Sequence, residues 1–188
     1  MVLVVAAVGT SKSGKTTTLE FLISRLAAEG YRIGSIKHIH REGFTIDREG
    51  TNTWRYAKAG AKVIVAISPE EIATIKKTSS ELNDLDKIIE ALKQEQLDII
   101  FIEGFHGVIA KRSDIPKIIT ATDEENLKHT LEGTAEPILA VTGVISKNKP
   151  DLKWLKVPIL NLEADGDKLL LMTKKFLKPM AQPKKPVN

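Results

Sequence analysis

Residues 2–30 read VLVVAAV-GTSKSGKT-TTLEFLISRLAAEG. The apolar run at the start predicts a β-strand over Leu3–Val8, and apolar residues at helical spacing from Leu19 to Leu26 predict a helix. Between the two, Gly9–Thr16 matches the full G-x-x-x-x-G-K-[ST] pattern of a P-loop, the glycine-rich turn that binds nucleotide phosphates. The stretch therefore predicts a strand, a phosphate-binding loop and a helix in direct succession.

The spacing within this loop has a physical reason. Gly9 and Gly14 let backbone N–H groups approach the phosphates, and the following helix adds unpaired N–H groups and a partial positive charge. Lys15 is predicted to bridge the β- and γ-phosphates, and the hydroxyl of Thr16 to bind Mg²⁺. The predicted nucleotide contacts are Gly9, Thr10, Ser11, Lys12, Ser13, Gly14, Lys15, Thr16 and Thr17.

Short β-branched runs alternate with helical patterns along the chain, which indicates repeated βαβ units and an α/β fold. We expect a P-loop NTPase-type, mainly parallel sheet with helices on both faces, in a single nucleotide-binding domain over residues 1–178. A last helix is expected from about Asp167 to Leu177, and the Pro- and Lys-rich residues 179–188 are expected to be disordered. The predicted strands are Leu3–Val8, Arg32–Lys37, Lys62–Ile67, Asp98–Ile102, Lys117–Thr120, Ile138–Thr142 and Pro158–Asn161.

A second chemical signal is the run Asp98-Ile-Ile-Phe-Ile-Glu-Gly-Phe, an apolar strand that ends in a carboxylate. Ligands of parallel sheets bind where the strands end, and in P-loop folds an acid at the end of a neighbouring strand holds the Mg²⁺ shell. Glu103 is therefore the predicted metal residue beside Thr16. Asp98 opens the same strand and is predicted to lie at the opposite edge of the sheet.

The polar, glycine-punctuated segment from Ile36 to Ala61 begins where a predicted strand ends, so we expect it over the phosphates. The candidates for phosphate or metal contacts are Lys37, His38, His40 and Asp47. Arg55 is expected to project from a short helix that starts near Thr51. The sequence thus predicts nucleotide contacts for Lys37 and Arg55 and a metal contact for Asp47.

Residues 148–151 read Asn-Lys-Pro-Asp, a literal N-K-x-D. In GTPases the carboxylate of this motif accepts two N–H groups from the guanine edge, a contact that adenine cannot make. We therefore predict guanine contacts for Asn148, Lys149 and Asp151. The alternative is a polar turn in which Pro150 and Asp151 cap the next segment of the chain. Hydrolysis would need a positioned water and a cation in the transition state, and the sequence identifies neither.

The net charge of +4 over 188 residues invites a nucleic-acid function, but its distribution argues against one. Residues 172–188 hold five lysines and no acidic residue, so residues 1–171 carry 23 basic and 24 acidic side chains. No basic stripe is interleaved with aromatic residues, and we expect no nucleic-acid partner.

Other function classes are excluded by what the sequence lacks. No apolar run approaches the roughly 20 residues of a membrane span, and no basic segment precedes the first one as in a signal peptide, so we expect a soluble, cytoplasmic protein without a membrane partner. The absence of cysteine excludes disulfides, thiolate metal sites and thiol nucleophiles.

In this order, the motifs resemble the family of the molybdopterin-guanine dinucleotide biosynthesis protein MobB. The resemblance covers about the first two thirds of the chain, and apart from the P-loop it is the ordered set that is specific. Its residues are Gly9–Thr16 with Thr17 and Leu19, Ile36-Lys37-His38 with His40, Phe44 and Asp47, Thr53, Arg55 and Ala59-Gly60-Ala61, Ile102-Glu103-Gly104-Phe105, and Pro116-Lys117-Ile118.

The resemblance implies a protein that binds GTP and Mg²⁺, hydrolyses GTP weakly or slowly, and is a homodimer. It implies an adapter that acts beside the guanylyltransferase joining GMP to molybdopterin, or beside its tungsten counterpart. Such a protein holds or delivers nucleotide or molybdopterin and does not itself make the new bond.

Two departures from the family pattern are visible. Where the family has Gly-Lys-Asp-Ser ahead of the arginine, this chain has Gly50-Thr51-Asn52-Thr53, which lacks the lysine and the acid. After Phe105 it has His106 and Gly107 where a lysine is expected, with Lys111 and Arg112 as substitutes.

Two other classes of P-loop protein compete with the adapter. A small-molecule kinase would use the Lys111-Arg112 loop as a lid, although kinase lids bring several arginines together. A switching GTPase or partitioning ATPase is disfavoured, since a glutamate replaces Asp-x-x-Gly and Thr10 stands where the deviant ATPase P-loop has its second lysine.

Overall fold

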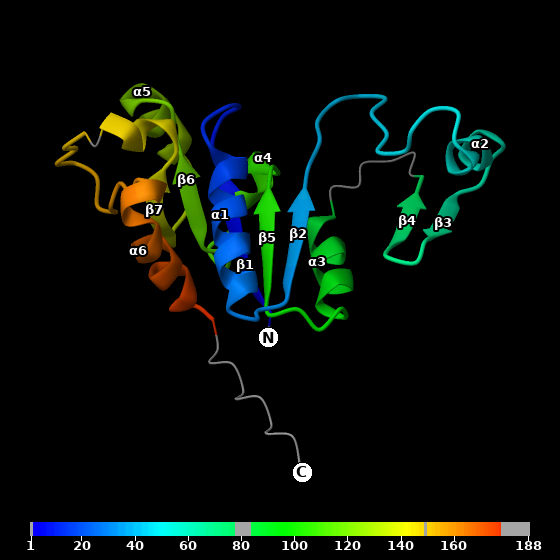
Figure 1. Cartoon of the computed structure of the whole chain (residues 1–188). Helices are drawn as coiled ribbons and strands as arrows, with labels where there is room; N and C mark the ends of the chain where they lie inside the picture. Colours follow the sequence, from blue (N-terminus) through cyan, green and yellow to red (C-terminus); the bar gives the residue numbers. More distant parts are fainter. Residues whose placement is uncertain (1, 78–83, 149, 178–188) are drawn as a thin grey trace, which may run out of the picture. The chain divides into compact units, whose positions relative to one another are not determined.

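The computed structural model describes residues 2–77, 84–148 and 150–177 (Figure 1). They form two compact units. The first comprises the chain up to His38 and from Ala91 onward, and the second, which we call the inserted unit, is Ile39–Glu90. The structure thus separates an inserted unit within the span that the sequence predicts as one domain, and the predicted tail 179–188 lies outside the described residues.

The first unit is built on a five-stranded sheet in which every neighbouring pair of strands is parallel, in the order β2-β5-β1-β6-β7. This confirms the predicted α/β fold with a mainly parallel sheet. All residues of β5 are buried, as expected for a strand of a parallel sheet that is covered on both faces. The strands are β1 (Leu3–Val8), β2 (Ile33–Lys37), β5 (Ile99–Glu103), β6 (Lys117–Thr120) and β7 (Ile138–Thr142).

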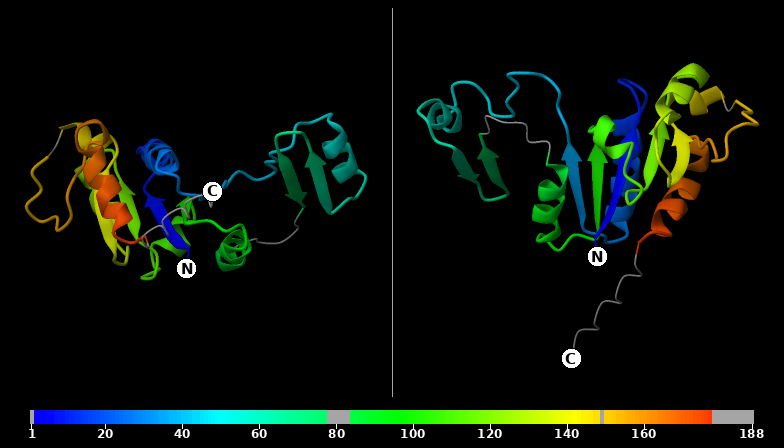
Figure 2. Two further views of the ribbon diagram at one scale, coloured as in Figure 1. Left: turned by 60° about the horizontal axis from the view of Figure 1, so that its bottom comes forward. Right: turned by 180° about the vertical axis from the view of Figure 1, so that it is seen from behind.

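Helices cover both faces of this sheet (Figure 2). The helices α1 (Lys15–Ala28) and α6 (Leu162–Lys174) lie on one face, and α4 (His106–Ile109) and α5 (Glu124–Leu131) lie on the other. The handedness of crossovers explains the division. The chain moves one way across the sheet from β1 to β2 and the opposite way from β5 to β6 and β7, so right-handed connections must pass over opposite faces.

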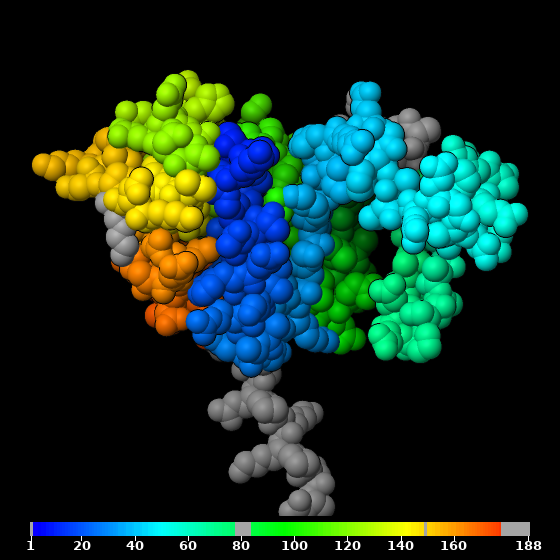
Figure 3. Space-filling view, turned by 45° about the horizontal axis from the view of Figure 1, so that its top comes forward, coloured from blue at the N-terminus to red at the C-terminus, as the bar shows by residue number. Residues whose placement is uncertain are grey.

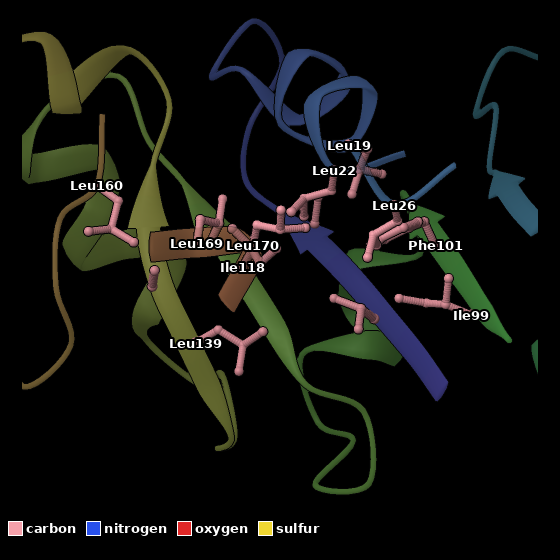
Figure 4. Close-up of a cluster of buried hydrophobic side chains, with 13 residues drawn as sticks. Leu19, Leu22, Leu26, Ile99, Phe101, Ile118, Leu139, Leu160, Leu169 and Leu170 are labelled. Carbon is pink, nitrogen blue, oxygen red and sulfur yellow. The ribbon is translucent and has the colours of Figure 1, made fainter. Parts of the chain in front are cut away.

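A cluster of buried apolar side chains lies between the sheet and the helices α1 and α6 (Figure 4). Leu19, Leu22 and Leu26, which the sequence places on one face of a helix, point toward the strands and are at most 6% exposed. Leu169 and Leu170 of α6 complete the same cluster. The helix that follows the phosphate loop is therefore anchored along its length, which fixes the position of its first turn.

The inserted unit contains α2 (Asn52–Lys58) and an antiparallel hairpin of β3 (Val63–Ile67) and β4 (Ile72–Lys76). The predicted strand Lys62–Ile67 is therefore correct as a strand but wrong as a member of the parallel sheet, and β4 was not predicted. The turn explains the pairing, because Ser68 N donates to Glu71 O at 2.9 Å and its hydroxyl accepts from Glu71 N at 3.0 Å. The helix α3 (Leu85–Lys93) runs across the boundary between the units.

Two further predictions near the carboxyl end need correction. The predicted strand Pro158–Asn161 is reduced to one bridge between Ile159 and Val141. The last helix begins at Leu162 instead of near Asp167, because Asn161 Oδ1 accepts from the backbone N–H groups of Glu163 and Ala164 at 3.0 and 3.2 Å. A short 3₁₀ helix, η1 (Val144–Asn148), follows β7. None of the helices in the described part of the chain is long and apolar enough to cross a membrane.

Candidate functional site

The P-loop lies at the point where the sheet changes direction. It joins β1 to α1, while the neighbouring strand β6 is followed by α5 on the opposite face. Such a switch point leaves a crevice at the carboxyl ends of the strands, where α/β proteins bind ligands. Figure 3 shows the loop (dark blue) at the surface, beside the segment that contains α5 (lime).

Close packing explains the two glycines of the loop. A Cβ atom at Gly9 would lie 2.2 Å from Thr120 O, and one at Gly14 would lie 2.9 Å from the Cα of Gly143. Gly14 also has a φ of 108°, a left-handed conformation that side chains rarely adopt. The ends of β6 and β7 therefore press against the loop and hold its shape.

The Ser13 side chain is part of this packing and is not exposed to a ligand. It is fully buried, donates to Thr10 O at 2.8 Å and shares a 2.6 Å hydrogen bond with the Thr120 hydroxyl. Of the predicted nucleotide contacts, Ser13 can therefore serve only through its backbone. At the tip of the loop, the Thr10 hydroxyl donates to Asn126 Oδ1 of α5 at 3.3 Å.

Lys15 folds back over the loop that precedes it. Its ammonium donates to Gly9 O at 3.0 Å and to Thr10 O. Burial lowers the pKa of Lys15, the charge of Glu103 acts in the opposite direction, and the charge of Lys37 adds to the lowering. The Lys15 ammonium thus lies close enough to interact electrostatically with Glu103 and with Lys37.

The structure brings Thr16, Glu103 and Lys37 together. The Thr16 hydroxyl donates to both carboxylate oxygens of Glu103, at 3.1 and 3.0 Å, and the ammonium of Lys37 forms an ion pair with Oε1. The pairing of parallel strands explains why these side chains lie together, because Glu103 is in register with Ala7 of β1 and with Lys37 of β2. Residues far apart in the sequence therefore end at the same edge of the sheet.

This pair of oxygen donors fits Mg²⁺. The ion prefers oxygen ligands and in nucleotide sites is bound by one or two protein groups, with phosphates and water completing its shell. In residues 2–77, 84–148 and 150–177, no group of three or more His, Asp or Glu side chains is arranged to hold a metal alone. A metal at Thr16 and Glu103 would thus depend on the nucleotide for its remaining ligands.

The predicted contacts in the middle segment belong to the inserted unit, apart from Lys37. Asp47 Oδ1 accepts from the hydroxyls of Thr51 and Thr53, at 3.1 and 2.9 Å, while Oδ2 is buried without a hydrogen-bond partner in the described structure. Thr51 also caps α2 by accepting from Trp54 N, and Arg55 is exposed on that helix. The metal role of Asp47 and the nucleotide role of Arg55 stay predictions.

The residues predicted to contact guanine come after the chain segment that contacts the P-loop. Val144 N donates to Ser13 O at 3.2 Å, and η1 then runs to Asn148. At about 2 Å per residue, η1 spans roughly 10 Å, the scale on which a base extends from its phosphates. Asp151 lines a hollow of about 210 Å³ with five neighbours from the segment 150–159, none of them from the P-loop. Lys149 lies outside the described residues, and the guanine role stays a prediction.

Two histidines lie near these residues: His38, which the sequence indicates as a candidate for phosphate or metal contacts, and His106, which it does not. His38 stacks on Phe105 at 4.1 Å between ring centroids, and its backbone N–H donates to Glu103 O at 2.9 Å. Burial lowers the pKa of His106, and the nearby charges of His129 and Lys15 add to this. His106 therefore stands near Lys15, where no histidine was predicted. Only the strand order could have revealed this.

Comparison with known proteins decides the family. The sequence profile described as MobB, molybdopterin guanine dinucleotide synthesis protein B, matches residues 4–144. The chain belongs to the MobB family. The profile covers the P-loop, Lys37, Asp47 and Glu103, whereas residues 148–151 and α6 lie beyond it.

Relatives of the MobB family support this membership. The molybdopterin-guanine dinucleotide biosynthesis adapter protein of Haemophilus influenzae is 34% identical over 133 residues, which are 71% of this chain and 70% of the relative. The adapter protein of Escherichia coli is 34% identical over 124 residues, 65% of this chain and 67% of the relative. The crystal structure of Bacillus subtilis MobB aligns with a TM-score of 0.73 and 25% identity over 94% of this chain and 98% of that chain.

Family membership gives the first departure a structural meaning. The segment that reads Gly-Thr-Asn-Thr in place of the pattern with lysine and acid supplies two hydroxyls to Asp47. Thr51 donates to Asp47 and also accepts from Trp54 N, and a lysine at this position could not accept the second of these hydrogen bonds.

Proposed function

We propose that this chain is a GTP-binding adapter of molybdopterin guanine dinucleotide biosynthesis. It holds GTP for the guanylyltransferase that joins GMP to molybdopterin, and hydrolyses it slowly at most. The observation that carries this is the complete P-loop at the switch point, with Thr16 facing Glu103, in a chain of the MobB family. Relatives of 34% identity are named adapter proteins of this biosynthesis. We place the protein in the cytoplasm, where nucleotide and partner enzyme meet.

In this proposal the backbone N–H groups of Gly9–Thr17 and the ammonium of Lys15 bind the phosphates. Thr16 and Glu103 hold Mg²⁺, which neutralises phosphate charge when bound. Asn126 fixes the loop tip through Thr10, and the buried hydroxyl pair of Ser13 and Thr120 fixes its base. These contacts give a rigid phosphate site, and nothing in them positions an attacking water.

Association with the guanylyltransferase tests the proposal. The purified partner enzyme should be retained by the immobilised full chain, and retention should change on addition of GTP with Mg²⁺ if the nucleotide is handed between them. Lack of association both with and without GTP would contradict the adapter function. Transfer of a phosphate group from the nucleotide to a small-molecule acceptor would support the kinase alternative.

The structure speaks against that kinase alternative. The Lys111-Arg112 segment lies between α4 and β6, and it supplies one arginine. Arg112 is also engaged by Asp114, with two contacts of 2.7 Å. A lid needs its arginine free to reach the phosphates, whereas the Arg112 guanidinium is paired with the Asp114 carboxylate.

We also propose a homodimer, supported by the hairpin of the inserted unit. One face carries Ile64, only 5% exposed, whereas Val63, Val65 and Ile67 on the other face are 56%, 53% and 76% exposed. Their neighbour Ile72 of β4 is 70% exposed. A two-stranded ribbon needs a covered apolar face to be stable in water, and a second copy offers the same surface in self-complementary form.

Val65→Asp should therefore weaken the dimer. Each change occurs twice at a two-fold interface, and loss of one buried valine costs about 1.5–3 kcal/mol, so the dissociation constant should rise by about 100-fold or more. Sedimentation velocity at micromolar concentration measures this. Leu171→Asp, an equal change at an exposed position of α6, is the matched control. Unchanged dimerisation of Val65→Asp would remove the hairpin from the interface.

A further inference from the structure

Glu103 has one fixed and one mobile partner. The carboxylate is only 8% exposed and accepts the Thr16 hydroxyl at both oxygens. The side chain of Lys37, which pairs with Oε1, is 54% exposed. Thr16 belongs to the first turn of an anchored helix, whereas the long lysine side chain can swing into solvent at little cost. Lys37 is therefore the partner that can leave.

The backbone on either side of this pair is held in place. Lys37 and Glu103 are register partners on β2 and β5, and the next residue, His38, donates its N–H to Glu103 O and stacks on Phe105. A Cβ atom at Gly104 would lie 2.7 Å from the Cβ of His38, which shows how closely the two strand ends approach. Any release of Lys37 thus involves its side chain and leaves the strand ends together.

The charges around Glu103 disfavour a bare divalent cation. Lys15 and Lys37 both interact electrostatically with this one carboxylate, so the cluster carries a net positive charge. A dication bound at Glu103 would be repelled by two ammonium groups, because like charges close together repel each other strongly where water screens them little. A metal bound directly at Oε1 would also lie next to the Lys37 ammonium, whose positive charge repels it. The phosphates of a bound nucleotide add negative charge and so make the net charge around Glu103 negative.

We propose that Lys37 and the divalent cation exclude each other on Glu103, so that the chain binds the cation only together with a nucleotide, whose phosphates receive the displaced lysine. This inference rests on the proposed nucleotide site. Lys37 is thereby the residue that makes metal binding conditional on nucleotide binding. Because coupling between two ligands is reciprocal, the metal must also strengthen nucleotide binding.

Binding of Mn²⁺, a spectroscopic probe for Mg²⁺, tests the exclusion without any activity measurement. Free Mn²⁺ is followed by electron paramagnetic resonance during titration of the nucleotide-free full chain. Lys37→Met keeps the apolar stem and removes the charge, so it should bind Mn²⁺ about tenfold or more tightly than the unmodified chain. The double variant Lys37→Met/Glu103→Gln should lose this binding, which assigns it to the carboxylate.

Two controls separate charge at this position from charge in general. Lys153→Met makes the same change at an exposed lysine in the loop after η1 and should leave Mn²⁺ binding as it is in the unmodified chain. Lys37→Arg retains a cation and should also bind Mn²⁺ no better than the unmodified chain. Circular dichroism of each variant verifies its fold.

The outcomes distinguish this inference from the function on which it rests. Equal Mn²⁺ affinity of the unmodified chain and Lys37→Met, including no binding by either, overturns the exclusion. Calorimetry of GTP with EDTA and with Mn²⁺ supplies the second arm. An unmodified chain that binds GTP in neither condition contradicts the proposed nucleotide site, whereas one that binds GTP equally tightly in both contradicts only the coupling.

Discussion

Lys15→Ala should lower the affinity for GTP by about 100-fold or more, equivalent to about 2.7 kcal/mol. The substitution removes a charged donor to the phosphates, and such hydrogen bonds contribute about 1.5–3 kcal/mol. It also removes the hydrogen bonds that tie the Lys15 ammonium to Gly9 O and Thr10 O across the loop. Calorimetric titration of GTP with Mg²⁺ into the full chain measures the loss.

Lys168→Ala is the matched control, because it deletes an exposed lysine of α6 far along the chain from the P-loop and should leave the affinity unchanged. Retention of GTP binding by Lys15→Ala would contradict phosphate binding at this loop. The same titration with ATP addresses the base. Tighter binding of ATP than of GTP would contradict the guanine role predicted for Asp151.

Lys117→Met should lower the free energy of unfolding by about 2–4 kcal/mol and the melting temperature by roughly 5–15 °C. Lys117 is fully buried at the start of β6, and its ammonium donates to the backbone carbonyls of Arg112, Ile115 and Ala135, the last two at 3.0 and 2.9 Å. Methionine fills the same space but removes the ammonium donor from three carbonyls, one of them buried and two partly buried. Urea unfolding followed by circular dichroism measures the change.

The pH dependence of stability gives an independent check on Lys117. Burial lowers the pKa of this ammonium below its ordinary 10.5, which the charges of Asp114 and Glu136 partly oppose. Between the lowered value and 10.5 the unfolded chain binds more protons than the folded chain, so stability should rise with pH there. Lys117→Met should reduce this rise, to which the lowered pKa of Lys15 also contributes, while Lys111→Met, at an exposed neighbour, should retain it in full. If Lys117→Met unfolds at the same urea concentration as the unmodified chain, the structural role of Lys117 is contradicted.

Local sequence patterns predicted the structure correctly where the interactions that determine it join residues close together in the chain. The sequence predicts β1, the P-loop and α1 because strand, glycine-rich turn and helix are consecutive, and the structure has them at those residues. It also predicts that Thr16 and Glu103 meet, because carboxyl ends of parallel strands share an edge. The hairpin was missed as a pair because a short apolar run looks the same in a parallel and an antiparallel sheet.

Contacts between distant segments were beyond the reach of residue spacing. These contacts depend on the pairing of β6 with β1 and of β7 with β6, and they join Thr10 with Asn126, Ser13 with Thr120 and Gly14 with Gly143. Nothing in the local composition of those segments sets the strand order. Likewise, the burial of Lys117 follows from the carbonyls gathered around its ammonium, which come from two loops.

By itself, the sequence determined the α/β class, the phosphate loop and the resemblance to the MobB family, since each rests on residues consecutive in the chain or on an ordered set of motifs. Only the tertiary structure decided that one carboxylate, Glu103, is shared by Thr16 and Lys37. The physical reason is that strand register places three segments at one edge of the sheet, where their charges act on one another over a few ångströms.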